Sequence, residues 1–260
     1  MDADALYGRM IRAFRDRGRV LVAYSGGVDS GLVARLAHDA LGDDALAVIT
    51  DAESLSRREL AEARAEAAEI GIFLRVVPVS ELESAAYAAN PVNRCYFCRG
   101  QLAAALTGIV ALEAFSTIAD GIHGSDLGDD RPGIRAMNEA RFWHPLLEFG
   151  LAKADVRALA RALGLSFWDK PSNACLSSRI PHGTPITIPL LRQVEAAEDV
   201  LRDRGFRQVR VRHHGTTARI EVPPTDVPRL RAIEDEVADA LRGLGYRETI
   251  VDPDGYRAPA

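Results

Sequence analysis

The sequence predicts an α/β protein, in which a doubly wound parallel sheet precedes a small C-terminal α+β domain. Three observations predict this fold. Short apolar runs alternate with helical patterns up to residue 77, as they do when helices connect parallel strands. A Ser-Gly-Gly-Val-Asp-Ser segment at residues 25–30, called the glycine turn below, joins the first apolar run to a helical pattern. Beyond residue 187, two strand patterns lie between helical patterns.

The first part of the chain alternates helix and strand. Residues 2–17 have the spacing of an amphipathic helix, and a short apolar run that begins at Val20 predicts a buried strand leading into the glycine turn at Ser25. A helix follows the turn. The alternation continues with a strand at 45–50, a helix at 60–70 that Gly71 ends, and a strand at 72–77. Because ligands bind at the carboxyl ends of such strands, we expect the site there.

Candidate functional residues lie in the predicted helix and strand that come next in the chain. A helix is predicted within residues 93–110, which contain Cys95 and Cys98. The strand at 116–119 ends in Asp120-Gly121, a second expected ligand edge. Residues 122–138 hold few apolar side chains and include Arg131-Pro132-Gly133, so we predict a mobile loop that closes over the site.

The second domain begins after an irregular segment. Residues 169–189 show no periodicity, and three prolines there disfavour a helix or a central strand. We therefore predict a first domain over residues 1–186 and a substrate-binding or oligomerisation domain over 187–260. Its patterns indicate a helix at 190–201, strands at 208–212 and 218–222, a helix at 230–244 and a strand at 249–251.

Composition narrows the function classes. The chain has 260 residues, enough for two domains, and a net charge of −5, which gives no general attraction to nucleic acid or acidic membranes. No apolar run appears long enough to span a bilayer and no signal peptide is recognisable, so we expect a cytoplasmic protein. Three cysteines do not suggest a disulfide framework.

The glycine turn has the chemistry of a phosphate site. Gly26 and Gly27 have no Cβ, so an anion can approach the backbone, and the helix that follows favours negative charge. Ser25 and Ser30 add hydroxyl groups, whereas Asp29 fits beside phosphate only with Mg²⁺ between them. The lysine of a Walker A loop is missing. The segment instead resembles the PP-loop of ATP pyrophosphatases, which hold the β,γ-phosphates and transfer AMP. Residues 144–153 resemble their second signature, which implies that Lys153 lies near the nucleotide.

The cysteines and arginines leave alternatives open. Cys95 and Cys98 form a C-x-x-C, which suits a redox pair, half a zinc site that a histidine completes, or part of an iron–sulfur site with Cys175. Packed thiols are the plain alternative. Arg210 and Arg212 share one face of a strand, where they suit a phosphate or a carboxylate, or simply solvent.

The chain resembles the LarE family of PP-loop sulfur transferases over nearly its whole length. The resemblance rests on the glycine turn, Asp120-Gly121, Arg131-Pro132-Gly133, the segment Pro171-Ser-Asn-Ala-Cys-Leu-Ser-Ser-Arg179 with Pro181-x-Gly183, Val209-Arg-Val-Arg212 and Ala218-Arg-Ile-Glu221. It implies that ATP and Mg²⁺ activate a carboxylate of pyridinium-3,5-biscarboxylic acid mononucleotide, a precursor of the nickel-pincer nucleotide cofactor. Sulfur then replaces an oxygen.

The resemblance also assigns roles. ATP would contact Ser25, Gly26, Gly27, Asp29, Ser30, Asp120 and Lys153. Ser178, Arg179, Arg210 and Arg212 would hold the nucleotide substrate. Cys175 would handle sulfur in one of two ways. It would either be a sacrificial donor or, with Cys95 and Cys98, hold a [4Fe-4S] cluster whose open iron carries an extra sulfide, the route that three cysteines favour. A homo-oligomer is implied, and the sulfur donor is not identified.

Three other functions compete with this one. A PP-loop tRNA thiolase would need a basic surface, which the net charge of −5 disfavours. An ammonia-dependent ligase of the NAD or GMP synthetase type would give Cys175 no task. A nucleotide-binding regulatory protein would show no turnover.

Overall fold

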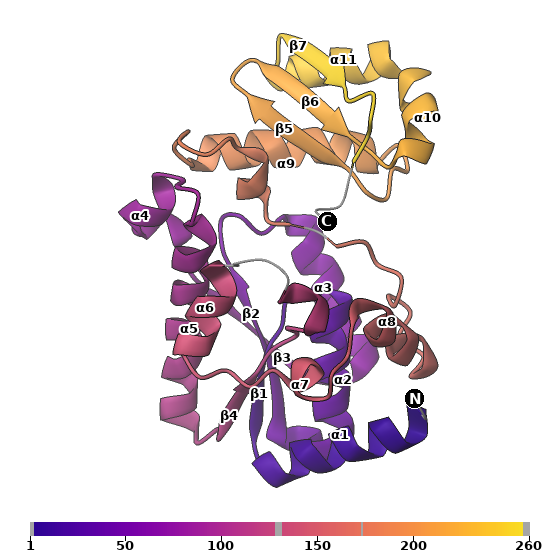
Figure 1. The fold of residues 1–260 in the computed structure, drawn as a ribbon. Coiled ribbons are helices and arrows are strands. Elements are labelled where there is room, and N and C mark those ends of the chain that lie inside the picture. Colours follow the sequence, from indigo (N-terminus) through magenta and orange to yellow (C-terminus); the bar gives the residue numbers. More distant parts are fainter. Residues whose placement is uncertain (1–2, 128–131, 173, 257–260) are drawn as a thin grey trace. The chain divides into compact units, whose positions relative to one another are not determined.

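The computed structural model describes residues 3–127, 132–172 and 174–256 (Figure 1). The chain forms two compact units. The first unit comprises Met1–Glu81 and Asn93–Ser172, and the second comprises Leu82–Val92 and Asn173–Ala260. Among the described residues, each unit contains one sheet.

The first unit is built on a four-stranded parallel sheet, which confirms the predicted fold class. The strands are β1 (Val20–Ala23), β2 (Ala45–Asp51), β3 (Phe73–Pro78) and β4 (Thr117–Ala119), in the spatial order β3-β2-β1-β4. Val20 pairs with Ala45 in β2 and with Thr117 in β4. The carboxyl ends of β1 and β4 therefore meet at one edge of the sheet, where ligands are expected.

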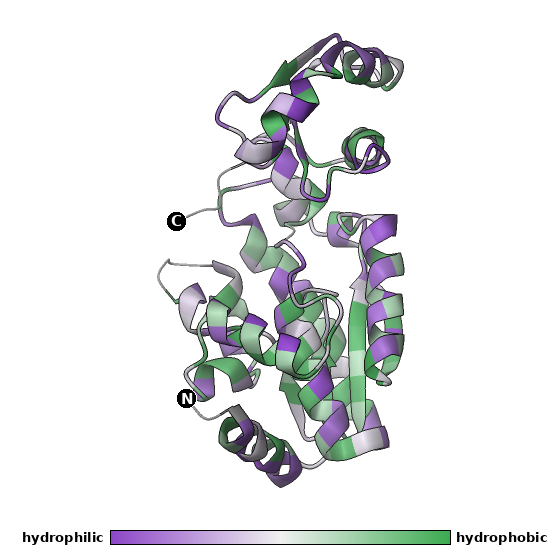
Figure 2. Cartoon of the chain, turned by 90° about the vertical axis from the view of Figure 1, so that its right-hand side faces the viewer, coloured by the Kyte–Doolittle hydropathy of each residue, from purple (hydrophilic) through white to green (hydrophobic). Residues whose placement is uncertain are grey.

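Helices cover both faces of this sheet. Val20 and Val22 belong to one core, and Leu21 and Ala23 belong to another, because successive strand residues point to opposite faces. The first core includes residues of α1 (Ala3–Arg17), α2 (Val28–Leu41), α3 (Arg57–Ile70), α7 (Pro145–Glu148) and α8 (Lys153–Ala162). The second includes residues of α5 (Arg94–Glu113) and α6 (Pro132–Glu139). Within this unit, Figure 2 shows green, hydrophobic strands and helices that carry both green and purple residues.

The loop predicted over residues 122–138 is wrong in part. A short 3₁₀ turn forms at Gly124–Asp126, and α6 begins at Pro132. Proline is favoured in the first turn of a helix, and α6 buries Ala136 and Met137. The tertiary contact of α6 with α5 supplies the apolar surface that the sequence pattern did not reveal. Arg131 lies outside the described residues.

Helix α5 corrects a second expectation. It is 20 residues long, and its length and apolar composition suffice to cross a membrane, contrary to the sequence interpretation. In the structure α5 packs against α6 and β4, and it buries Ala103 and Leu106. This packing gives α5 a place in the core of the first unit.

The second unit has a three-stranded sheet in the order β5-β6-β7. Its elements are α4 (Ala85–Ala88), α9 (Ile188–Arg202), β5 (Arg210–His214), β6 (Thr217–Glu221), α10 (Val227–Arg231), α11 (Glu234–Gly243) and β7 (Glu248–Val251). β5 is antiparallel to β6, and β6 is parallel to β7. The single helix predicted at 230–244 is divided between α10 and α11. Short 3₁₀ segments complete the described elements at Gly42–Asp44, Glu81–Glu83, Leu176–Arg179 and Pro224–Asp226.

The boundary between the units differs from the predicted boundary at residue 186. The amides of Gly183 and Ile186 donate to the carbonyls of Asn90 and Ala88. The Asn90 side chain is completely buried and donates to carbonyls of the same loop, including that of Thr184 at 2.9 Å. These bonds tie residues 82–92 to the loop that carries Cys175. A contact between segments so far apart leaves no mark on local periodicity.

Candidate functional site

The glycine turn connects β1 to α2. Gly26 has a φ of 70°, and a Cβ there would lie 2.6 Å from the Cβ of Ala63 in α3. Glycine is therefore the residue that fits this conformation and this close approach. The Ser30 hydroxyl accepts a bond from the Ser25 amide at 3.1 Å and donates to the Gly27 carbonyl at 3.2 Å. These bonds close the turn at the amino end of α2, where N–H groups and the helix dipole favour phosphate.

Asp29 forms an ion pair with Lys153, and both residues were predicted to contact ATP. The Lys153 ammonium lies 2.6 and 2.7 Å from the two carboxylate oxygens. Lys153 is the first residue of α8, and its backbone N–H donates to the Ser125 hydroxyl at 3.2 Å. Nε2 of the buried His123 lies 3.6 Å from the same carboxylate. Lys153 is thus positioned to leave the Asp29 carboxylate and to bind a phosphate group of ATP in its place.

Asp120 follows β4 and lies beside the glycine turn. A Cβ on the adjacent Gly121 would lie 2.7 Å from the backbone nitrogen of Ser30, so the two chain segments are in close contact. Oδ1 of Asp120 lies 2.7 Å from Nδ1 of His144. Oδ2 is buried and, among the described residues, has no hydrogen-bond partner. An unsatisfied buried carboxylate oxygen is a place for a cation or a donor.

These residues fit ATP with Mg²⁺. A glycine turn, a helix amino end and a lysine suit phosphate. The carboxylates of Asp29, in the first turn of α2, and of Asp120, directly after β4, provide the oxygen ligands that Mg²⁺ prefers. The structure brings together all the predicted ATP residues of the first unit. The sequence interpretation considered a histidine only as the residue that completes a zinc site, and it gave His123 and His144 no place beside ATP. Their place beside Asp29 and Asp120 depends on tertiary contacts.

The cysteines are divided between the units. Cys95 and Cys98 lie in the first turn of α5, three residues apart and so on one side of the helix. Cys95 is exposed and Cys98 is half-buried. Cys175 belongs to the second unit, where it precedes the 3₁₀ turn at Leu176–Arg179. Across the described parts of the chain, no group of three or more His, Cys, Asp or Glu side chains is arranged to hold a metal ion.

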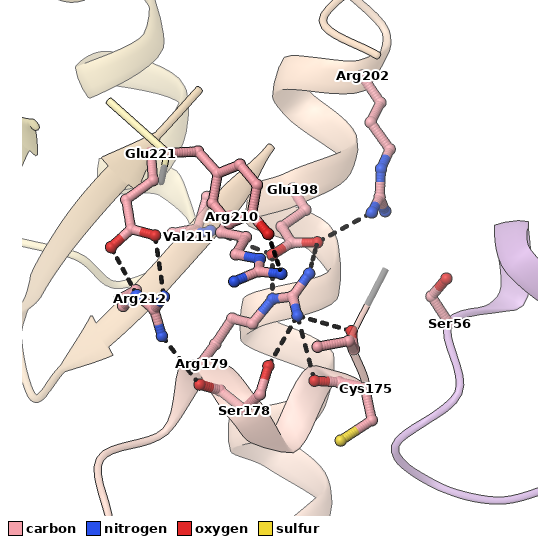
Figure 3. A network of polar contacts seen from close by, with 12 residues as sticks. Ser56, Cys175, Ser178, Arg179, Glu198, Arg202, Arg210, Val211, Arg212 and Glu221 are labelled. Carbon is pink, nitrogen blue, oxygen red and sulfur yellow. Dashed lines mark hydrogen bonds and ion pairs between the residues drawn. The ribbon is translucent and has the colours of Figure 1, made fainter. Parts of the chain in front are cut away.

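The loop that carries Cys175 is held by Arg179 (Figure 3). Nη1 of Arg179 donates to the Ala174 carbonyl at 2.6 Å and to the Ser178 hydroxyl at 2.8 Å. Nε and Nη2 of the same guanidinium donate to the Glu198 carboxylate at 2.7 and 3.3 Å. Both side chains are almost completely buried. These contacts make Arg179 a brace between the loop and α9.

Arg210 and Arg212 emerge from the same face of β5, as predicted, with buried Val211 between them. Arg212 forms two bonds to Glu221, at 2.6 and 3.0 Å, and its Nη1 donates to the Ser178 carbonyl at 3.2 Å. Arg210 donates to the Tyr256 hydroxyl at 2.9 Å, and burial lowers the pKa of its guanidinium. Ser178, Arg179 and Arg212 therefore lie in one polar network, and Arg210 lies beside it with its bond to Tyr256 (Figure 3).

The three arginines differ in how exposed their side chains are. Arg210 and Arg212 are half-buried and remain candidates for binding an anionic substrate. The Arg179 guanidinium instead faces a carboxylate and backbone carbonyls inside the second unit. Its predicted role as a substrate ligand stays a prediction, whereas its contacts favour a role in positioning the loop.

Comparisons with known proteins cover both units. Residues 12–113 match the family model described as NAD synthase. The chain is 41% identical to an uncharacterized protein of Synechocystis, over 94% of this chain and 92% of that protein. It is 36% identical to pyridinium-3,5-bisthiocarboxylic acid mononucleotide synthase of Lactiplantibacillus plantarum, over 96% of this chain and 91% of that protein. A stretch covering 24% of the chain is 41% identical to 12% of the glutamine-hydrolyzing GMP synthase of Chlamydia caviae.

Proposed function

Because the chain belongs to the LarE family of PP-loop sulfur transferases, we propose that it activates a carboxylate of pyridinium-3,5-biscarboxylic acid mononucleotide with ATP and inserts sulfur there. The observation that carries the proposal is the glycine turn in its folded setting. Its Gly26 conformation, the α2 amino end and the Asp29–Lys153 pair are the parts a triphosphate needs. The similarity to the Lactiplantibacillus synthase extends over 96% of the chain, which supports the same substrate class.

The reaction proceeds in two substitutions. A substrate carboxylate oxygen attacks the α-phosphorus of ATP, and pyrophosphate leaves with the electron pair of the broken P–O bond. A sulfur nucleophile then attacks the acyl carbon, and AMP leaves. Glycine-turn amides and Lys153 would stabilise the departing pyrophosphate, because fixed donors favour developing negative charge. Arg210 and Arg212 would orient the anionic mononucleotide.

The proposal also includes how the enzyme holds the sulfur that it transfers. Cys95, Cys98 and Cys175 would hold a [4Fe-4S] cluster, which when bound would supply an iron without a cysteine ligand. The exposed and half-buried thiols on the first turn of α5 suit two of the three positions. The alternative within the same family is sacrificial transfer of the Cys175 sulfur.

Pyrophosphate release tests the reaction. We expect release only when ATP, Mg²⁺ and the dicarboxylate mononucleotide are all supplied, together with a thiocarboxylate product detected by mass spectrometry. Asp29→Asn should lower the rate at least about tenfold, because it removes a charge from the metal-facing carboxylate. Release with tRNA or ammonia as the acceptor, and none with the mononucleotide, would overturn the proposal.

Iron analysis separates the two sulfur routes. After anaerobic purification, the cluster route predicts about four irons and four sulfides per chain, lost in Cys95→Ala. The sacrificial route predicts an iron-free protein whose Cys175 becomes lighter by the mass of H₂S after one turnover. A homo-oligomer, also proposed from the family, is tested by light scattering at several protein concentrations.

A further inference from the structure

We propose that Lys170 is a positioning residue for the ATP phosphates, which acts by fixing the peptide between Gly26 and Gly27. Nζ of Lys170 donates to the Gly26 carbonyl at 2.9 Å. No role for Lys170 follows from the sequence motif, since it stands 144 positions from Gly26 in the chain. The inference rests on the proposed function only in taking ATP as the ligand.

The geometry of the peptide bond gives this contact its consequence. In a planar trans peptide, the C=O and N–H bonds point in opposite directions. The Gly26 carbonyl is drawn to Lys170, whose ammonium lies among carboxylates of α3, so the Gly27 N–H must point away from α3. Gly27 is the N-cap residue of α2. Its N–H therefore belongs to the group of amides that can meet a phosphate.

Two adjacent glycines explain why an external donor is needed. A glycine adopts positive and negative φ at similar cost, so the peptide between Gly26 and Gly27 has little intrinsic preference for one orientation. A flipped peptide would turn a carbonyl oxygen toward the phosphates and remove a donor. A charged hydrogen bond to the carbonyl, of the kind that Lys170 makes, opposes this flip.

The segment before Lys170 is held on α2 and α3 by contacts that do not involve Lys170. Ser166 donates to the Glu69 carboxylate of α3 through its amide at 2.7 Å and through its hydroxyl at 2.5 Å. Phe167 packs against Gly31 of α2, where an added Cβ would lie 2.5 Å from the ring. The Lys170 amide then donates to the Phe167 carbonyl at 2.9 Å. The ammonium is thus delivered to the glycine turn by an ordered segment.

Carboxylates hold the ammonium in place. Oε1 of Glu66 lies 2.6 Å from Nζ of Lys170, and the half-exposed Glu62 lies at 3.1 Å. Burial raises the pKa of Glu66, while the bond to Lys170 opposes that rise. The Tyr24 hydroxyl lies 3.5 Å from the other Glu66 oxygen, and burial raises the pKa of this phenol. Lys170 therefore has two separable tasks, fixing the Gly26 carbonyl and neutralising Glu66.

Binding measurements distinguish these tasks. In equilibrium dialysis with Mg²⁺, we expect Lys170→Met to weaken binding of ATP and pyrophosphate by about 10- to 100-fold, the range for loss of a charged hydrogen bond. AMP has no β,γ-phosphates, so its affinity should stay within about twofold. The control Arg161→Met makes the same cation-to-thioether change on an exposed residue that stacks on Trp168. It should bind all three ligands normally.

A double variant decides the mechanism. If Lys170 acts on the Gly26 carbonyl, Lys170→Met combined with Glu66→Gln should bind ATP as weakly as Lys170→Met. Recovery of wild-type ATP affinity in the double variant would overturn the inference, because charge neutralisation would then explain the effect. Equal losses for ATP and AMP would also overturn it. Failure of the wild-type protein to bind ATP would instead remove the proposed function, and this inference with it.

Discussion

The role of Arg179 leads to a quantitative prediction for Arg179→Met. The substitution removes at least five hydrogen bonds that the guanidinium donates, and it leaves Glu198 buried, since the two side chains are 1% and 0% exposed. Breaking one partner out of a buried ion pair costs about 3–5 kcal/mol. Arg202 and the Val211 amide still donate to Glu198 at 3.0 and 3.1 Å. We therefore expect the free energy of unfolding of the second unit to fall by about 3 kcal/mol, the low end of this range.

Hydrogen exchange measured by mass spectrometry is the suitable assay. Both tryptophans of the chain, Trp143 and Trp168, lie in the first unit, so tryptophan fluorescence does not report on the second. Peptides from α9 and β5 should exchange about 100-fold faster in Arg179→Met, while those from β1 and β2 remain unchanged. Combining Arg179→Met with Glu198→Leu should recover part of the protection, because no unpaired carboxylate then remains buried.

Arg202→Met is the matched control for this experiment. Arg202 contacts the same carboxylate but makes no bond to the described residues of the Cys175 loop, and its side chain is 9% exposed. It should raise exchange in α9 and leave peptides spanning the 3₁₀ turn at Leu176–Arg179 protected. Wild-type exchange in Arg179→Met, accompanied by loss of mononucleotide binding, would refute the reasoning. Arg179 would then be a substrate ligand with little part in holding the loop.

Two further predictions concern one residue in each unit. Gly26→Ala should lower the stability of the first unit by about 2 kcal/mol or more in denaturant titrations followed by tryptophan fluorescence, because φ is 70° and the added Cβ meets Ala63. Gly27→Ala should cost much less, since its nearest neighbour lies at 3.5 Å, and equal losses would contradict this. Burial lowers the pKa of His213, so the unfolded chain binds a proton first and the second unit should lose stability as the pH falls below about 6.5. Exchange measured at pH 8 and pH 5.5 should show that His213→Gln removes this loss and that the neighbouring His214→Gln keeps most of it; equal behaviour would exclude His213 as the source.

The sequence was sufficient for the elements whose residues interact locally. The succession of strand β1, the glycine turn and helix α2 was predicted correctly, because apolar periodicity and glycine chemistry act within a few residues. The boundary between the units was predicted at residue 186, which differs from the division in the structure, and helix α6 was predicted as part of a loop. The first depends on Asn90 binding a loop about Thr184, and the second on apolar contact with α5. Both contacts stabilise the protein only after separate segments of the chain have come together, so local sequence patterns do not reveal them.

The same limit applies to the roles of charged side chains. Arg179 and Arg212 have identical chemistry, and a motif places both near substrate. Their partners distinguish them: Arg179 is enclosed with Glu198 in the protein interior, whereas Arg212 remains half-buried beside Glu221. Lys170 shows the converse, since no pattern marks it and yet it donates to the carbonyl of Gly26. A motif identifies the atoms that meet a ligand, but the donors that orient those atoms come from elsewhere in the chain. A reliable assignment of function to a side chain therefore requires knowing which of its hydrogen-bonding positions are already occupied.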